Sequence, residues 1–170
     1  MTERQPYDLI KRFETFELRF YPEHVLVEVI TKGPFMQAGN LGFRPLVNYI
    51  SGRNAQSKKF AMTAPVLQTP NQADDEHRIA FVLPAGVSIK DVPAPVDGYV
   101  TTRVVQEHKV AVVSFGGGWN EAKSKSLGAQ LRKDVVAAGL KPVGEVYYAR
   151  FDPPWKPGFL KHNEALLDLE

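Results

Sequence analysis

The feature that most constrains the fold is a pattern that the chain repeats. A strand-like stretch beginning at His24 reappears, at one constant offset, as a stretch beginning at His108. Each then passes a glycine, Gly33 or Gly117, before a segment with helical spacing. The order strand, strand, helix, strand, strand therefore occurs twice along the chain, which predicts an internal repeat with pseudo-two-fold symmetry. A chance match of short motifs is the alternative. The matched residues are Glu23, His24, Val27, Val29, Gly33 and Phe35 against Glu107, His108, Ala111, Val113, Gly117 and Trp119.

Eight stretches alternate apolar and polar residues or are rich in β-branched ones, as short strands are. Strands in this order, with a helix in each half, favour an α+β fold in which antiparallel strands curl into a barrel and both helices lie outside it. The predicted strands are residues 16–21, 25–31, 62–69, 78–83, 99–106, 109–115, 145–151 and 165–169.

The first predicted helix contains residues that disfavour helices. Gly39 and Gly42 precede Pro45, which fits best in a first turn or at a kink. We therefore expect these residues to break or delay the helix. Its apolar face consists of Phe43, Leu46, Val47 and Ile50.

The second predicted helix has recognisable end signals. Asn120 is suited to be its N-cap, and Gly139 is suited to follow its last turn. Its apolar face consists of Leu127, Leu131, Val135 and Ala138.

Length and composition limit the class of protein. A chain of 170 residues, of which 44% are hydrophobic and 24% charged, is expected to fold as a single domain, with half-repeats at about 14–85 and 99–170. The absence of cysteine excludes disulfides, cysteine zinc sites and thiolate-bound haem. With a net charge of +2 and no long apolar run, we expect a cytoplasmic protein, monomeric or weakly oligomeric, that binds neither nucleic acid nor membranes.

No signature of catalysis is found in the sequence. No serine lies in a nucleophile elbow, and the run Gly116–Gly118 lacks the spacing of a phosphate-binding loop, so a tight turn is the better reading. We expect no catalytic residues and no enzymatic activity.

The histidines are too scattered for a dedicated zinc site, because none is three or four residues from another. His24 and His108 occupy equivalent places in the two halves. They are candidate iron ligands, while exposed strand ends are the commoner use of such histidines.

Two segments mix aromatic residues with proline: residues 58–66 and residues 151–159. In the second, Trp155 and Phe159 stand near Lys156 and Lys161. Flat apolar side chains beside cations suit a planar dicarboxylate such as haem. A rigid connector that closes the barrel end is the alternative reading.

At this level of detail the sequence resembles the SOUL family of haem-binding proteins. The similarity extends over nearly the whole chain, and the Met62–Val66 block together with the tail that ends in Asn163 and Glu164 is its most specific part. The matching features are Tyr7 onwards with Glu17, Leu18, Arg19 and Tyr21; Phe43 to Asn54 with Tyr49 and Gly52; Met62-Thr63-Ala64-Pro65-Val66; Gly116-Gly117; Tyr147 and Tyr148; and Asp152-Pro153-Pro154 through Asn163-Glu164.

The resemblance implies a distorted eight-stranded barrel flanked by two helices, and non-covalent haem or tetrapyrrole binding without catalysis. It implies an apolar groove bordered by the first helix and the proline-rich C-terminal loop, with basic residues such as Lys156 facing the propionates. The candidate ligand-binding residues are Phe43, Leu46, Val47, Ile50, Met62, Trp155, Lys156, Phe159 and His162.

Two positions depart from the family pattern. Members with an axial histidine have it in the first strand, where this chain has Phe20, so the iron ligand is left open; many members have tryptophan where Leu166 stands. Two other functions remain open. One is a binding module for another small hydrophobic ligand, as in GyrI-like effector domains, and the other is an enzyme acting on a bound tetrapyrrole or lipid.

Overall fold

The computed structural model describes residues 2–71, 75–118, 120–153 and 155–170. The chain divides into two compact units, and each unit takes two segments of the sequence. Unit 1 is Met1–Gln5 with Glu23–Gln106, and unit 2 is Pro6–Pro22 with Glu107–Glu170. Trp119, the repeat counterpart of Phe35, and Pro154 of the C-terminal motif lie outside the described residues.

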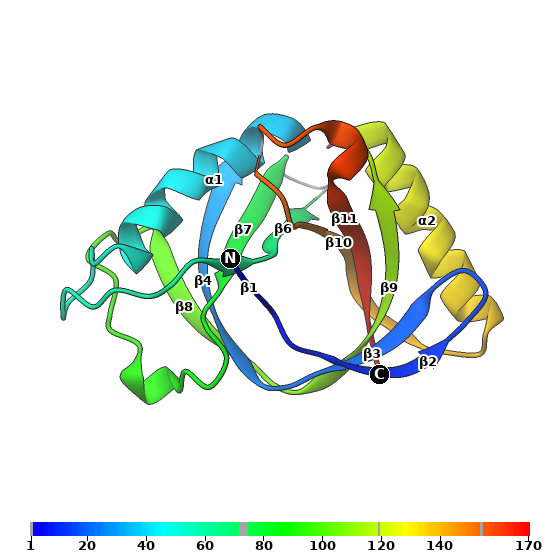
Figure 1. Ribbon diagram of the computed structural model, residues 1–170, viewed down its shortest axis with the longest axis horizontal. Helices are drawn as coiled ribbons and strands as arrows, with labels where there is room; N and C mark the ends of the chain where they lie inside the picture. The colour runs from blue at the N-terminus through cyan, green and yellow to red at the C-terminus, as the bar shows by residue number, and fades with distance from the viewer. Residues whose placement is uncertain (1, 72–74, 119, 154) are drawn as a thin grey trace. The chain divides into compact units, whose positions relative to one another are not determined.

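Unit 1 contains a four-stranded antiparallel sheet with a helix packed on it (Figure 1). The strand order is β6 (Val66–Asn71), β7 (Glu76–Val82), β4 (His24–Lys32) and β8 (Val100–Val105). Helix α1 (Phe35–Ile50) packs against β4 and β7. The two-residue strands β1 (Glu3–Arg4) and β5 (Thr63–Ala64) form a parallel pair, and η1 (Ile89–Asp91) is a 3₁₀ turn.

The prediction that Gly39, Gly42 and Pro45 break or delay the first helix is wrong, because α1 runs through all three. Gly42 lies so close to the sheet that a Cβ atom there would be 2.7 Å from Ile79. The glycine therefore lets the helix approach β7, and the burial of Leu46 against the sheet offsets the hydrogen bond that the proline cannot make.

Unit 2 contains a five-stranded antiparallel sheet. The strand order is β2 (Asp8–Arg12), β3 (Glu17–Tyr21), β9 (His108–Gly116), β11 (His162–Leu169) and β10 (Pro142–Arg150). Helix α2 (Glu121–Ala137) packs against β9, β10 and β11, and η2 (Gly158–Leu160) is a 3₁₀ turn before β11.

The predicted ends of α2 are confirmed. The side chain of Asn120 accepts a hydrogen bond from the Lys123 amide at 2.9 Å, and Gly139 follows the helix with φ of +80°. The predicted apolar face is only partly right, because Leu127 is half-buried and Ala138 is exposed. The buried residues of α2 are Ser124, Gly128, Leu131 and Val135.

The two units have the same internal strand order. In unit 1 the order β6, β7, β4, β8 places the long strand β4 between β7 and β8. In unit 2 the order β10, β11, β9, β3 places the long strand β9 between β11 and β3. Each long strand is followed by a glycine with positive φ, Gly33 at +120° and Gly117 at +94°. β3 is the first predicted strand of the first sequence half, but it pairs with β9 in unit 2. β8 is the first strand of the second half, but it pairs with β4 in unit 1.

The prediction of an antiparallel α+β protein with two helices is confirmed. Each of the eight predicted strands overlaps a strand of the structure, the predicted strand 62–69 is divided into β5 and β6, and the described residues add the strands β1 and β2. Within the same described ranges, neither helix is long and apolar enough to cross a membrane.

Candidate ligand-binding site

Polar side chains line the face of the unit 2 sheet that points away from α2. Tyr148 of β10 lies against Gly128 of α2, and side chains alternate between the two faces of a strand. Tyr147 therefore points away from α2, as does Leu166, its Cα partner on β11. The same alternation places three polar residues of β11 on this face: His162, Glu164 and Asp168.

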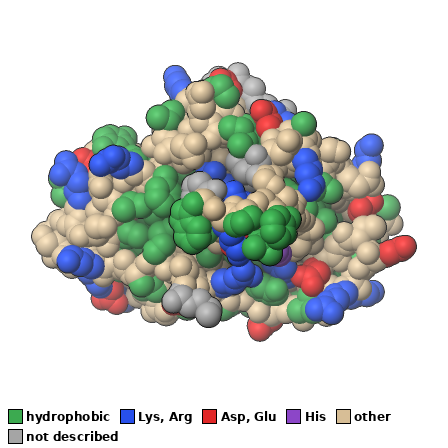
Figure 2. Space-filling model, turned by 45° about the horizontal axis from the view of Figure 1, so that its top comes forward, with side chains coloured by type: hydrophobic (Ala, Val, Ile, Leu, Met, Phe, Trp, Pro, Cys, Tyr) green, Lys and Arg blue, Asp and Glu red, His purple; other side chains and the backbone are tan. Residues whose placement is uncertain are grey.

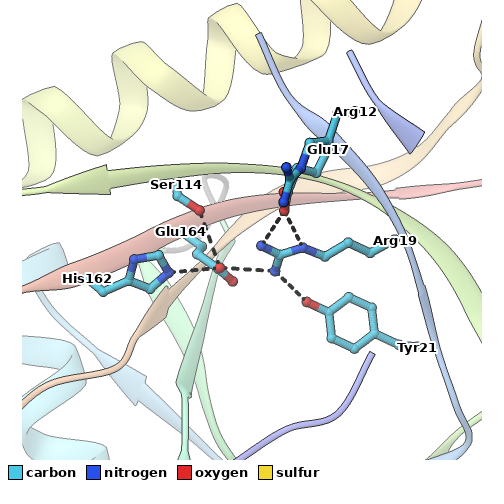
Figure 3. Close-up of polar contacts among 7 residues, drawn as sticks. All are labelled: Arg12, Glu17, Arg19, Tyr21, Ser114, His162 and Glu164. Atoms are coloured by element: carbon cyan, nitrogen blue, oxygen red, sulfur yellow. Dashed lines mark hydrogen bonds and ion pairs between the residues drawn. The ribbon is translucent and has the colours of Figure 1, made fainter. Parts of the chain in front are cut away.

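Arg19 of β3 joins two carboxylates on this face (Figure 3). Its Nη1 donates to Oε2 of Glu164 at 3.0 Å, and the two side chains are only 4% and 3% exposed. Its Nε and Nη2 donate to Oε1 of Glu17 at 3.0 and 2.7 Å. Nη1 also donates to the hydroxyl of Tyr21 at 3.0 Å. The guanidinium thus has partners on most of its edge, as a buried arginine requires.

The pKa values of this cluster follow from burial and from the charges it brings together. Burial alone would lower the pKa of Arg19, but the charge of Glu164 acts together with the contacts to Tyr21 and Glu17, and their sum outweighs burial and raises the pKa. Burial, and then the charge of Glu164, raises the pKa of Tyr21 to about 12. Burial opposes ionisation of Glu17, yet Arg19 and Arg12 hold the pKa of its carboxyl below the usual value. At neutral pH the Arg19 guanidinium is therefore a cation, the Glu17 carboxylate an anion and the Tyr21 phenol neutral.

His162 is bound to the same buried carboxylate. Its Nε2 lies 3.0 Å from Oε2 of Glu164, and its side chain is 34% exposed. The imidazole and the ring of Phe151 pack in a T-shaped arrangement, with ring centroids 4.9 Å apart. Within the described parts of the chain, Nδ1 of His162 has no hydrogen-bond partner.

Ser114, Glu164 and His162 do not form a catalytic triad, although they lie together in Figure 3. Ser114 Oγ is 3.5 Å from Oε2 of Glu164, the same oxygen that contacts His162. The carboxylate thus lies between the hydroxyl and the imidazole, whereas a triad needs the imidazole in the middle to remove the proton from the nucleophile. The other oxygen of Glu164, Oε1, is buried without a hydrogen-bond partner among the described residues.

The segment before β11 holds aromatic side chains in solvent. Asp152 accepts hydrogen bonds from Nζ of Lys156 at 2.7 Å and from the backbone amide of His162 at 2.6 Å, which fixes the base of the segment. Trp155 and Phe159 are each 83% exposed. Exposed hydrophobic side chains with lysine and arginine beside them are visible on the surface in Figure 2. Large side chains exposed in this way are typical of a binding surface.

The remaining predicted residues lie in unit 1, and the structure brings only part of them to the surface of that unit. Phe43 is 44% exposed, and its ring packs against that of Phe81 in a T-shaped arrangement with ring centroids 5.3 Å apart. Val47 and Met62 are partly buried against the core. Leu46 and Ile50 belong to the buried core of unit 1, together with Val25, Val27, Val29, Tyr49, Ile79, Phe81, Leu83 and Val100.

The two histidines named as candidate iron ligands begin equivalent strands. His24 is the first residue of β4, and His108 is the first residue of β9. Nε2 of His108 lies 3.2 Å from Oδ1 of Asp168, which also accepts a hydrogen bond from Tyr147 at 2.7 Å. Over the described ranges, no three histidine, aspartate or glutamate residues form a group that could hold a metal ion.

The sequence reasoning did not identify Arg19 and Glu164 as parts of a site, although both stand in the motifs of the resemblance. A signal was available: Glu17, Arg19 and Tyr21 alternate along one strand, so they share one face. The partner on β11 could not be inferred, because it depends on which strands are neighbours.

Comparison with known proteins decides the family. The sequence matches the SOUL heme-binding protein family over residues 2–168. The chain belongs to this family. Heme-binding protein 1 of Xenopus tropicalis is 28% identical over 158 residues, which are 88% of this chain and 81% of that protein.

Solved structures share the fold of this SOUL protein at low identity. The C-terminal domain of EcmrR is 12% identical, with a TM-score of 0.70 over 96% of this chain and 98% of that one. A protein from Listeria innocua described as a hydrolase has a TM-score of 0.61 at 12% identity, over 95% and 94% of the two chains. SAV2435, solved bound to tetraphenylphosphonium, has a TM-score of 0.52 at 11% identity, over 91% and 93%.

Proposed function

We propose that this SOUL protein binds haem or a related tetrapyrrole non-covalently, for carriage, buffering or sensing. The observation that supports this most directly is the pair of aromatic side chains, Trp155 and Phe159, that the segment before β11 leaves 83% exposed. Membership of the family and the similarity to Heme-binding protein 1 point to the same ligand.

The residues of unit 2 fit the chemistry of haem. Trp155 and Phe159 offer flat apolar surfaces for the porphyrin, Lys156 offers a cation for a propionate, and His162 offers a ring nitrogen for the iron. At roughly 25 cal/mol per Å², covering a few hundred Å² of porphyrin contributes several kcal/mol before the costs of association. An exposed ion pair adds only about 0–1 kcal/mol. Apolar contact therefore dominates the affinity, and Lys156 orients the ligand.

In unit 1, the proposal assigns ligand contact to the outer margin of α1. Phe43 is the exposed member of the predicted stripe and Val47 is partly buried, so both can contact a ligand without unfolding the unit. Leu46 and Ile50 belong to the buried core beneath the helix, and Met62, partly buried as Val47 is, stays a proposed contact. The distorted barrel that the family resemblance implies remains part of the proposal.

A second candidate function is binding of another hydrophobic small molecule, because SAV2435 has a related fold and was solved with an apolar cation. A cation would favour a buried carboxylate without a cationic partner. The buried carboxylates of the described chain, Glu28 and Glu164, are paired with Arg103 and Arg19 at 2.7 and 3.0 Å. This pairing favours a tetrapyrrole over a cation, and we propose no enzymatic activity.

The test is a fluorescence and absorbance titration of the purified protein with haem, with metal-free protoporphyrin and with tetraphenylphosphonium. Both porphyrins are expected to bind more tightly than the cation. Trp155→Ala is expected to weaken porphyrin binding by about tenfold, which corresponds to ~1.4 kcal/mol of lost apolar contact. Tyr99→Ala removes an aromatic side chain that is 61% exposed in unit 1, and it is the matched control. Tight binding of the cation without porphyrin binding would refute the proposal.

A further inference from the structure

We propose that His162 is the axial ligand of the haem iron and that it binds through Nδ1. This inference rests on the proposed function, since it names the atom of this chain that the iron of a bound haem contacts. The coordination is a simple one: the lone pair of a neutral imidazole bonds the ferric iron, and the proton on Nε2 stays in its hydrogen bond to Glu164.

The two ring nitrogens of His162 differ in their hydrogen-bond partners. Nε2 is 3.0 Å from Oε2 of Glu164, a carboxylate that is 3% exposed, so the proton of the neutral ring resides on Nε2. That tautomer leaves the lone pair on Nδ1, which has no hydrogen-bond partner among residues the structure describes. A metal-binding histidine characteristically donates its other N–H group to a carboxylate, which fixes the ring and makes it more basic.

Glu164 is itself held in place by its partners. Nη1 of Arg19 donates to the same Oε2 atom at 3.0 Å and to the hydroxyl of Tyr21, while Glu17 holds Nε and Nη2 on the other side of the guanidinium (Figure 3). The carboxylate therefore cannot swing away from the imidazole when the histidine changes its bonding. Its second oxygen, Oε1, is buried and without a partner within the described residues, so negative charge beside the ring is only partly compensated. Such charge favours ferric over ferrous iron.

The other three histidines are less suited to bind the iron of this haem. Both ring nitrogens of His77 have partners, Nδ1 with Nε2 of Gln68 and Nε2 with the carbonyl of Gly33, each at 3.1 Å, and the residue is 5% exposed. His24 and His108 begin strands and are not part of the aromatic segment, the stretch between β10 and β11 that carries Trp155 and Phe159. His162 closes that segment, because its amide binds Asp152 and its carbonyl accepts from the Phe151 amide.

A single protein ligand predicts a five-coordinate, high-spin haem in the ferrous state. The experiment measures absorbance, resonance Raman and reduction potential of the haem complex in the wild type and in His162→Gln. Glutamine can keep a hydrogen bond to Glu164 but supplies no imidazole. The variant is expected to lose the iron–histidine stretching band and at least about tenfold of haem affinity, ~1.4 kcal/mol. Added imidazole is expected to restore the histidine-ligated spectrum. The affinity of the His162→Gln variant for metal-free protoporphyrin should match that of the wild type.

His24→Gln and His108→Gln are the matched controls and are expected to retain the band. Glu164→Gln tests the positioning role of the carboxylate and is expected to raise the reduction potential while the iron–histidine band remains. If His162→Gln keeps the wild-type spectrum, or if either control loses the band, the axial assignment is wrong although the proposed function stands. If neither porphyrin binds to the wild type, the proposed function fails and the assignment fails with it.

Discussion

Arg19 reaches across a strand to pair with Glu164. Arg19 is on β3 and Glu164 is on β11, and β9 lies between these two strands in the sheet. Two strand spacings amount to about 9–10 Å, which a long arginine side chain can span. The 3.0 Å contact between Nη1 and Oε2 therefore ties three strands together on one face of unit 2. It also connects the two ends of the family motif, the first strand and the C-terminal tail.

Removing one partner of this buried ion pair should lower the free energy of unfolding far more than removing one partner of an exposed ion pair. Arg19→Ala leaves the charge of Glu164 buried, so we expect the free energy of unfolding to fall by about 3–5 kcal/mol. Arg12→Ala removes an arginine that is 75% exposed, although it also bonds Glu17, and should cost only about 0–1 kcal/mol. Urea unfolding of both variants measures the difference. Equal losses would show that burial does not determine the strength of these pairs.

Gly42 should be intolerant of even a methyl group. Its Cβ would lie 2.7 Å from Ile79, so Gly42→Ala must push α1 off β7 or distort the side chain, and we expect a loss of about 1–3 kcal/mol. Without that contact, alanine in a helix would stabilise by about 0.5–1 kcal/mol. Gly98→Ala, where nothing lies within 4 Å of the added Cβ, is the control and should change little. Thermal melts measure the stability of both variants. A Gly42→Ala variant more stable than the wild type would contradict the close approach of α1 to β7.

The sequence was most informative where local patterns determine structure. Alternation predicted the strands because one face of each strand packs on a core, and Asn120 and Gly139 marked the ends of α2 because their backbone roles are local. The beginning of α1 was not predictable in this way. Gly42 and Pro45 disfavour an isolated helix, and only packing against Ile79 and the rest of the sheet stabilises it.

The polar cluster was beyond sequence reasoning for a different reason. Alternation places Glu17, Arg19 and Tyr21 on one face, but strand order decides what they meet. β3 pairs with β9, far along the chain, although β4 follows it directly in sequence. This long-range pairing brings Arg19 to Glu164. The predicted ligand-binding residues other than His162 have no part in that cluster.

The buried phenol of Tyr21 should make the protein sensitive to alkali. Its pKa is about 12 in the fold and 10.0 as the ordinary value, so the unfolded chain loses this proton first as pH rises. The resulting stabilisation is complete below pH 10 and disappears between pH 10 and 12. Tyr21→Phe should lower the stability at neutral pH by about 0.5–1.5 kcal/mol, because Arg19 loses a partner. The variant should also show a shallower decline above pH 10. Chemical unfolding at a series of alkaline pH values checks the slope, and identical slopes would refute the role of Tyr21.

Lys156 should have a small effect on porphyrin affinity that depends on charge. Its Nζ is 2.7 Å from Asp152 and its side chain is 35% exposed, so Lys156→Ala should weaken binding only by about two- to fivefold. Lys156→Glu places a negative charge near a propionate and beside Asp152, and should weaken binding more. Both effects should shrink at high salt, because exposed charges are screened. Titrations at two salt concentrations test this, and wild-type affinity in both variants would remove Lys156 from the site.

The helix α1 offers the sharpest separation between a ligand contact and a core residue. Phe43 is 44% exposed, so the charge in Phe43→Asp stays in water, and the variant should fold with a loss of about 1 kcal/mol, including the contact with Phe81. Its porphyrin binding should nevertheless be abolished, because a carboxylate replaces an apolar contact and repels the propionates. Leu46 is fully buried, and Leu46→Asp should unfold unit 1, since an unpaired charge in a core costs more than about 4 kcal/mol.

Val47→Asp tests the same margin at a partly buried position and should fall between these two variants in stability while losing porphyrin binding as Phe43→Asp does. Thermal melts and porphyrin titrations of the three variants separate the outcomes, because stability and binding are measured on the same samples. A Phe43→Asp variant that folds and binds haem as tightly as the wild type would remove α1 from the site. The aromatic segment of unit 2 would then be the only proposed ligand contact, and the apolar contribution to porphyrin affinity would have to come from Trp155 and Phe159.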